Sequence, residues 1–233
     1  MSIQNKIVAL IRTPYSLYHL QAASLFARLS GRIERDYKNE IPEEIHAEHR
    51  SYVTGSILLS VAFLEATINE LFADTVDSPT RFDGRLEPNT IKLMASVWQV
   101  EEFKRHARIL DKFQIALKLA SKPLFNEGWA SYQDVPLLIR LRNALVHYEP
   151  EWIVLRTDPP EVRPEHDFEK MLKGKFPLNP LAAKGSLFYP HKCLSHGCAA
   201  WAVITSEKFT SDFHTRMKII PIYERSISTL TTK

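Results

Sequence analysis

The chain has 233 residues, of which 45% are hydrophobic, and a formal net charge of only +3. This length suits one sizeable domain with a packed core. The charge excess is so small that the overall charge gives no reason to expect nucleic-acid binding. The first residues lack the apolar core of an export signal, and Cys193 and Cys198 are too close together for a disulfide framework. We therefore expect a cytoplasmic protein without a membrane partner.

The scarcity of glycine, 7 residues in all, and the spacing of apolar residues predict an all-α protein. The first helix is expected over 15–35, with an apolar side made of Leu17, Leu20, Ala23, Leu25 and Leu29. A long second helix is expected from Pro42 to Asp77, and its 4-3-4-3 stripe is typical of the seam of a helix bundle: Ile57, Val61, Leu64, Ile68 and Leu71. Further helices are expected at 88–98, 101–121 with a break near Arg108, 131–148 and 191–217.

The stretch 151–190 differs because proline interrupts it repeatedly. A short extended piece at 152–155 and a short helix at 166–173 are the regular elements expected there. The stretch is too short to form its own core, so it is interpreted as an irregular arm or cover of one helical domain spanning 1–233.

The helix predicted over 131–148 has an unusual distribution of side chains. At about 100° per residue, Leu137, Leu141, Leu145 and Tyr148 share one face, which we expect to dock into the bundle. Asn143 and His147 lie one turn apart on a polar face, with Arg140 near them, and Pro150 is expected to end the helix. Ile139 and Val146 form a second apolar patch, which must pack on another helix of the same chain or on a second copy of the protein.

Arg142, Asn143 and His147 bring a permanent cation, a carboxamide and an imidazole within two helical turns. These groups are suited to hold a phosphate and to move a proton beside it. The ordinary interpretation is a surface histidine near the negative end of a helix, with the arginine paired to an acid inside the bundle. The pattern Arg-Asn-x-x-x-His at the end of an apolar helix resembles the motif of the HEPN superfamily, small helical bundles that include metal-independent ribonucleases.

The resemblance covers roughly residues 45–150, including Ser60–Phe72, Asp111-Lys112-Phe113 and Trp129. It implies an HEPN-like helical bundle and a homodimer whose two motifs face one cleft, where RNA is cleaved. It also implies a toxin or phage-defence setting, with an antitoxin or a larger defence complex as partner. Tyr148 directly follows His147, so the chain lacks the Arg-x4-His-x-Tyr form of one toxin branch, and regulation by modification of that tyrosine is not expected.

Three further residues are candidates for binding or supporting roles: Glu65, Arg140 and Tyr148. Glu65 lies in an otherwise apolar stripe of the second helix, so it is expected either to hold the cation of Arg142 or to face water at the edge of the core. Lys104, Arg105, Arg108 and Lys112 form one basic helical face, which suits either a phosphate backbone or simple solvation.

The segment 191–198 contains four potential zinc ligands: His191, Cys193, His196 and Cys198. Their types suit a structural zinc site, but all four fall within eight residues, where side chains on one helix do not converge on one tetrahedral ion. We therefore expect no metal and no cofactor.

The sequence thus favours a metal-independent endoribonuclease that uses the RNA 2′-hydroxyl as its nucleophile. His147 is the expected general acid or base, and a dimer supplies two copies of it. Arg142 is expected to hold the phosphate, and Asn143 to orient His147 or contact the phosphate. The alternative is a non-catalytic, HEPN-like dimeric protein that binds RNA or acts as a scaffold.

Overall fold

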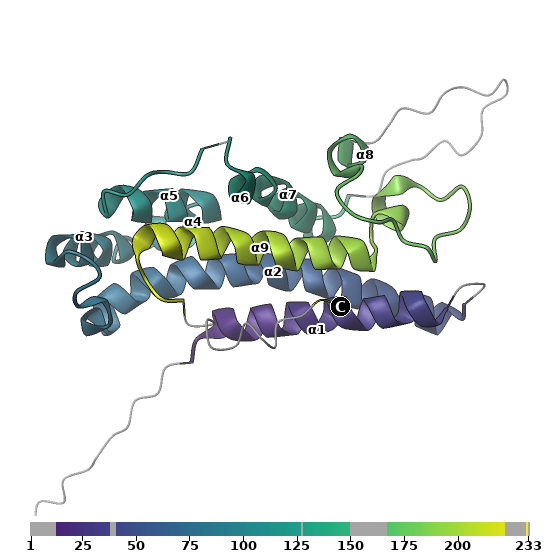
Figure 1. Cartoon of the computed structure of the whole chain (residues 1–233), viewed down its shortest axis with the longest axis horizontal. Coiled ribbons are helices and arrows are strands. Elements are labelled where there is room, and N and C mark those ends of the chain that lie inside the picture. The colour runs from purple at the N-terminus through teal and green to yellow at the C-terminus, as the bar shows by residue number, and fades with distance from the viewer. Residues whose placement is uncertain (1–12, 38–40, 127, 150–166, 222–231, 233) are drawn as a thin grey trace, which may run out of the picture.

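The computed structural model describes residues 13–37, 41–126, 128–149, 167–221 and 232. Within these ranges every regular element is helical, which confirms the all-α prediction (Figure 1). Three long helices lie side by side and form the body of the molecule: α1 (Tyr15–Asp36), α2 (Glu43–Asp77) and α9 (His196–Met217).

Small residues allow α1 to approach its two neighbours closely. The side of α1 that faces α2 and α9 is rich in serine, alanine and glycine: Ser16, Leu20, Ala23, Ser24, Ala27, Ser30 and Gly31. A methyl group added at Gly31 would lie 2.8 Å from the ring of His196, and one at Gly55 would lie 2.7 Å from the ring of Phe26. The prediction for the inward side of α1 is therefore wrong in part, because Leu25 is 42% exposed.

The predicted stripe of α2 is confirmed. Its five residues, Ile57, Val61, Leu64, Ile68 and Leu71, are all buried against the rest of the bundle. The helix begins directly after Pro42 and carries Glu43 and Glu44 in its first turn, where carboxylates favour the positive end of the helix dipole. By length and composition alone α2 is apolar enough to cross a membrane, a property that the buried core helix of a soluble protein shares, and 56% of its most apolar window is buried.

Three shorter helices pack beside one end of α2: α3 (Pro88–Trp98), α4 (Glu101–His106) and α5 (Ile109–Leu119). The 3-10 turn η1 (Pro79–Phe82) leads from α2 toward them. The predicted break near Arg108 is confirmed, because the backbone is extended at Ala107 and Arg108. Phe113 of α5 makes edge-to-face contacts at 4.8 Å with Phe209 and Phe213 of α9.

The predicted helix at 131–148 is two helices, α6 (Ala130–Gln133) and α7 (Val135–Val146). Pro136 has no N–H to donate to the carbonyl of Tyr132, so the hydrogen-bond ladder is interrupted there. At the other end α7 stops at Val146. Pro150 follows four residues later in the sequence and has no N–H to donate to the carbonyl of Val146, so the regular helical hydrogen bonds cannot continue. His147 and Tyr148 therefore lie beyond the helix, contrary to prediction.

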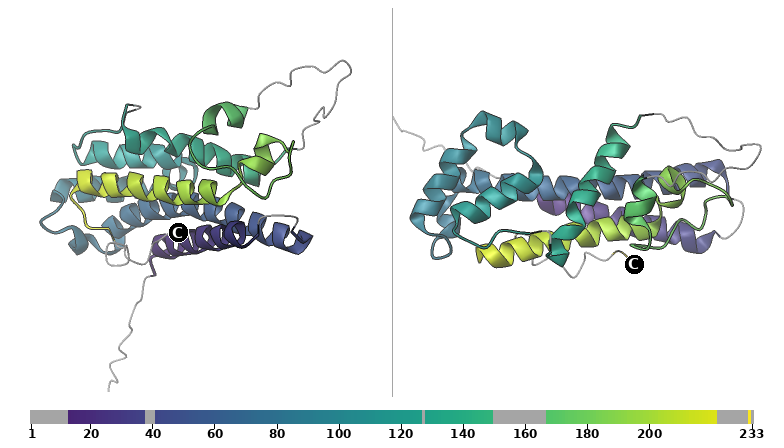
Figure 2. Two further views of the ribbon diagram at one scale, coloured as in Figure 1. Left: turned by 45° about the vertical axis from the view of Figure 1, so that its right-hand side comes forward. Right: turned by 90° about the horizontal axis from the view of Figure 1, so that it is seen from above.

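α7 packs against both α2 and α9. Seen from above, it crosses these long helices, and its C-terminal end projects past α2 (Figure 2). The end of the motif helix is therefore presented at an edge of the bundle.

The predicted arm at 151–190 lies partly outside the described residues, including the extended piece expected at 152–155. The predicted short helix is confirmed as α8 (Asp167–Leu172). Phe168, Leu172 and Phe176 are buried in the core, so this part of the arm packs into the bundle. The last helix begins five residues later than expected, after a π-helical turn, η2 (Phe188–Lys192), because the side chain of Ser195 accepts the N–H of Cys198 at 3.0 Å and caps α9.

Candidate functional site at the end of α7

The core-facing side of α7 differs from the predicted one. Val135, Leu138 and Leu141 are fully buried, whereas Tyr148 is 54% exposed. On an ideal helix Arg142 lies about 40° from Leu138, so it falls on this buried side. Arg142 is accordingly half-buried, and its Nε atom is buried without a hydrogen-bond partner.

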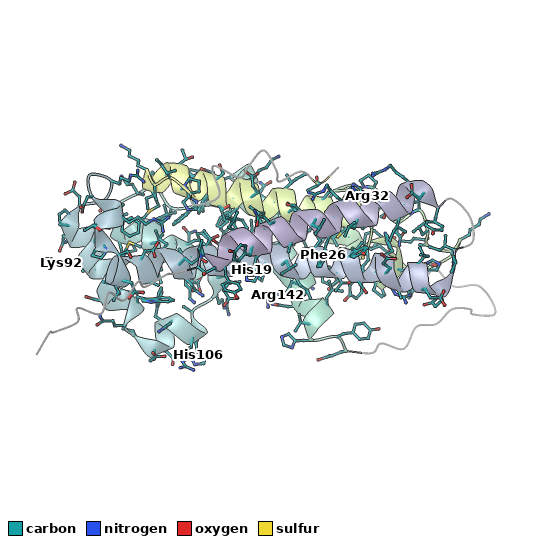
Figure 3. The ribbon with its side chains drawn as sticks, turned by 90° about the horizontal axis from the view of Figure 1, so that it is seen from below. His19, Phe26, Arg32, Lys92, His106 and Arg142 are labelled. Atoms are coloured by element: carbon teal, nitrogen blue, oxygen red, sulfur yellow. The ribbon has the colours of Figure 1, made fainter. Side chains whose placement is uncertain are left out.

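An unpaired buried N–H group costs roughly 1–3 kcal/mol, so its presence calls for a structural or functional reason. Figure 3 shows Arg142 on the same side of the molecule as His19, Phe26 and Arg32 of α1. Arg142 is therefore partly buried at this face of the bundle, and its buried Nε forms no hydrogen bond within the chain.

Asn143 and His147 are both exposed at the end of α7. His147 leaves the helix with φ −105° and ψ 49°, while its N–H donates to the carbonyl of Asn143 at 2.8 Å. The backbone thus joins these two residues directly, as the sequence suggested, but Asn143 is about 100° around the helix from Arg142. Arg142 is therefore partly buried, whereas the other two motif residues are exposed to solvent.

Arg140 does not join the motif residues. Its guanidinium lies 3.3 Å from Asp167 Oδ2 and 3.3 Å from Met171 Sδ, and stacks 5.5 Å from the ring centroid of Phe168. All three partners belong to α8. Arg140 therefore ties the motif helix to the segment that follows it in the chain, with a mostly exposed and hence weak ion pair.

Glu65 is exposed on α2, and within the described ranges no ion pair links it to Arg142. This favours the second of its two expected roles, a carboxylate facing water at the edge of the core. Its negative charge instead acts on Lys112: burial lowers the pKa of Lys112, and Glu65 partly opposes that effect.

Lys112 is not part of a basic surface, contrary to prediction, because it is only 2% exposed. Its Nζ donates to Asn69 Oδ1 and to the carbonyl of Lys104, both at 2.9 Å, and lies about 6 Å from the rings of Trp98 and Phe103. This environment of two hydrogen-bond acceptors and two aromatic rings was not predicted from the sequence. The one available signal was a lysine at a position of α5 whose neighbours along the same helical face are apolar.

The four residues of the predicted His/Cys cluster do not form a group of metal ligands in the structure. His196 Nδ1 donates to the carbonyl of Ala27 at 2.8 Å, and Cys193 and Cys198 are fully buried. Burial raises the pKa of Cys193 to about 12 and that of Cys198 well above its usual value. Within the parts of the chain that the structure describes, no three His, Cys, Asp or Glu side chains are grouped as metal ligands.

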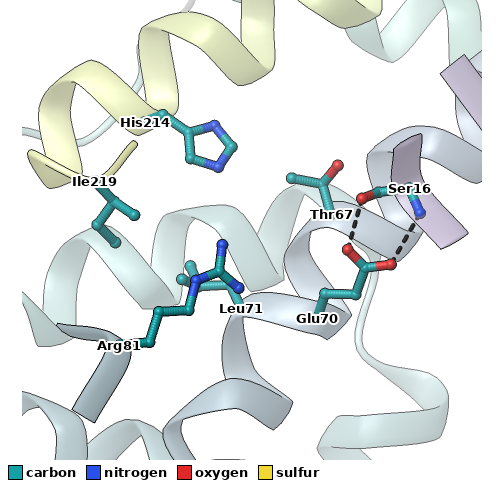
Figure 4. Close-up of a pocket in the computed structure, with 7 residues that line it drawn as sticks. All are labelled: Ser16, Thr67, Glu70, Leu71, Arg81, His214 and Ile219. Atoms are coloured by element: carbon teal, nitrogen blue, oxygen red, sulfur yellow. Dashed lines mark hydrogen bonds between the residues drawn. The ribbon is translucent and has the colours of Figure 1, made fainter. Parts of the chain in front are cut away.

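A second polar region lies where α1, α2, η1 and α9 meet (Figure 4). The carboxylate of Glu70 accepts hydrogen bonds from the backbone N–H and the hydroxyl of Ser16, at 2.8 and 2.6 Å. Burial lowers the pKa of His214 to about 4, a hydrogen bond to the Thr210 carbonyl opposes this, and the nearby charge of Arg81 adds to it. The Ser16–Glu70 contact joins the first turn of α1 to α2, which indicates a structural role.

Comparisons with protein-family models, with curated proteins and with solved structures found no match to this chain in any of the three.

Proposed function

We propose that this protein is a metal-independent endoribonuclease of HEPN type that cleaves RNA by attack of the 2′-hydroxyl on the adjacent phosphate. The observation that carries the proposal is the half-buried Arg142, whose Nε lacks a partner, beside the exposed Asn143 and His147 at the projecting end of α7. A guanidinium suits a phosphate, because it offers planar, permanently charged donors.

The chemistry requires one group that removes the 2′-hydroxyl proton and another that protonates the leaving 5′-oxygen. An imidazole has an ordinary pKa near 6.5 and serves either role. One chain contributes one motif histidine, so two copies of the protein are needed to place a base and an acid at one phosphate. Arg142 would stabilise the charge that builds on the phosphate, and the cytoplasmic setting would be that of a toxin or phage-defence effector.

The alternative, a non-catalytic dimer that binds RNA or acts as a scaffold, is favoured by one observation. His147 has left the helix, so it does not share a rigid helical face with Asn143. An exposed histidine beyond the last turn is held less firmly than the general acid or base of a preorganised site.

Four single variants separate these functions: His147→Ala and Arg142→Ala remove motif side chains, while His106→Ala and Arg50→Ala remove an exposed histidine and an exposed arginine on other helices. We expect the two motif variants to lose cleavage of single-stranded RNA by about 10²-fold or more, and the two controls to keep it within a few-fold. Full cleavage by a folded His147→Ala protein would contradict the mechanism. RNA binding without cleavage by the wild-type protein would leave the scaffold alternative.

A further inference from the structure

Three tyrosines in the described part of the chain are more than half exposed: Tyr15, Tyr18 and Tyr148, at 61%, 52% and 54%. Tyr15 and Tyr18 contact each other edge to face, with ring centroids 5.9 Å apart. Tyr148 differs from both, because among the described residues its ring contacts no other aromatic ring and its hydroxyl forms no hydrogen bond. The ring of Tyr148 is therefore available to a ligand.

Tyr148 lies directly beside the motif residues. α7 ends at Val146, and His147 leaves the helix with φ −105° and ψ 49°, so Tyr148 lies outside the helical face predicted for it. Successive Cα atoms are only about 3.8 Å apart, so a ligand that touches His147 also comes within reach of the Tyr148 side chain.

The predicted second apolar patch of α7 is only partly covered by the bundle. Ile139 packs against the core of its own chain, whereas Val146 is 51% exposed. His147 is therefore flanked in the sequence by two exposed and largely apolar side chains, those of Val146 and Tyr148. A phosphate is bound by charged groups and hydrogen-bond donors, so this apolar surface is not explained by a phosphate alone. A nucleobase has a flat π face on which an aromatic side chain stacks.

We propose that Tyr148 is a base-stacking residue, which binds an unpaired base next to the phosphate at His147. This inference rests on the proposed ribonuclease function and narrows its substrate to RNA with unpaired bases at the cleavage site. In a double helix the bases stack on one another, whereas loops, bulges and single-stranded ends leave their faces open to aromatic side chains. Paired regions of an RNA should therefore gain nothing from Tyr148.

The hydroxyl of Tyr148 is the rival explanation for any effect at this position, because a phenol also donates and accepts hydrogen bonds. Stacking depends on the ring alone. Tyr148→Phe keeps the ring and removes the hydroxyl, Tyr148→Trp keeps a large π face, and Tyr148→Ala removes both groups. Comparison of the three variants assigns the effect to one group.

Fluorescence anisotropy with a single-stranded RNA that carries 2′-O-methyl groups throughout measures binding without cleavage. Stacking of one base on an aromatic side chain corresponds to an affinity gain of about 5- to 150-fold, so we expect Tyr148→Ala to weaken binding by a factor in this range. Tyr148→Phe and Tyr148→Trp should bind within a few-fold of wild type. Tyr18→Ala removes a tyrosine of similar exposure on α1, and this control should also stay within a few-fold. Equal affinity of Tyr148→Ala and wild type, or an equal loss in Tyr148→Phe and Tyr148→Ala, would overturn the proposal.

The same strand annealed to its complement tests the preference for unpaired bases. Wild type and Tyr148→Ala should bind this duplex with equal affinity, because a paired base offers no free face to the ring. An equal loss of affinity for the duplex and the single strand would contradict base stacking. Tyr148 is exposed and lies beyond the end of α7, so each variant should keep the helical circular dichroism spectrum of the wild type.

Cleavage of the unmodified RNA separates this inference from the proposed function. We expect Tyr148→Ala to raise KM by the same factor as the dissociation constant and to change kcat only a few-fold, because stacking away from the reacting atoms contributes to binding. Cleavage by Tyr148→Ala with an unchanged KM would contradict the stacking role and leave the ribonuclease function intact. Binding through Tyr148 by a wild-type protein that cuts no RNA would contradict the ribonuclease function and keep the stacking role. A wild-type protein that binds no RNA would overturn both.

Discussion

Trp201 Nε1 donates a hydrogen bond to Asp134 Oδ2 at 3.1 Å, which joins α9 to the residue that immediately precedes α7. The other carboxylate oxygen of Asp134 accepts from Lys175 Nζ at 2.6 Å. Asp134 therefore links three parts of the chain at the base of the motif helix. Its position fixes where α7 begins, and so where Arg142 and His147 are presented at the other end.

Replacing Asp134 should destabilise the protein. Asp134→Ala removes both hydrogen bonds and leaves the nearly buried indole N–H of Trp201 without an acceptor. The ion pair with Lys175 is about one-third exposed on each side and contributes little, so we expect a loss of about 1–2 kcal/mol in the free energy of unfolding. Urea denaturation measures it. Asp83→Ala, at an exposed site, should change the same quantity by less than about 0.5 kcal/mol, and an equal loss in both variants would contradict this role.

Arg142 should matter for activity and hardly for stability. Arg142→Met keeps an apolar stem of similar length and removes an unpaired buried N–H, so we expect the free energy of unfolding to stay within about 1 kcal/mol of wild type while cleavage is lost. Arg81→Met is the contrast, because Arg81 forms an ion pair with the buried Asp74. Its loss leaves that carboxylate with less compensation and should cost about 1–3 kcal/mol, discounted for the exposure of Arg81. Strong destabilisation by Arg142→Met would indicate a structural ion pair instead.

His214 should make stability depend on pH. Its pKa is lowered to about 4 in the folded protein, below the ordinary value of 6.5, so the folded state binds this proton less readily than the unfolded chain. The contribution is therefore fully present above pH 6.5 and is lost as the pH falls from 6.5 toward 4, by as much as about 3 kcal/mol. His214→Asn should reduce the decline in unfolding free energy over this range, and His106→Asn, at an exposed site, should not. Parallel curves for wild type and His214→Asn would contradict this assignment.

Helices marked by apolar residues spaced over several turns, or by a proline at their start, could be predicted from the sequence. The stripe on α2 spans four turns, and helices that begin after Pro42 or at Pro88 carry a local signal, so their bounds agree closely with the structure. The break near Arg108 was also predicted. Such signals depend on residues near one another in the chain, and they do not need knowledge of the packing partner.

The orientation of two helices could not be predicted, because it depends on what they pack against. Serine and alanine on α1 are buried in place of Leu25, since close approach to α2 and α9 leaves no room for larger side chains. On α7 the buried side includes Nε of Arg142, and the positions of the leucines alone did not indicate this. The link between Asp134 and Trp201 joins residues 67 positions apart, and nothing local in the sequence indicates it.

The most direct test of the central claim is the chemistry of the cleaved product. Purified protein is incubated in EDTA with a single-stranded RNA and with the same sequence carrying 2′-O-methyl groups throughout. We predict that only the RNA is cut, and that its fragments carry a 2′,3′-cyclic phosphate and a 5′-hydroxyl, because the 2′-hydroxyl is the nucleophile. Cleavage of the 2′-O-methyl strand, fragments with a 5′-phosphate, or strict dependence on Mg²⁺ would contradict the proposed mechanism.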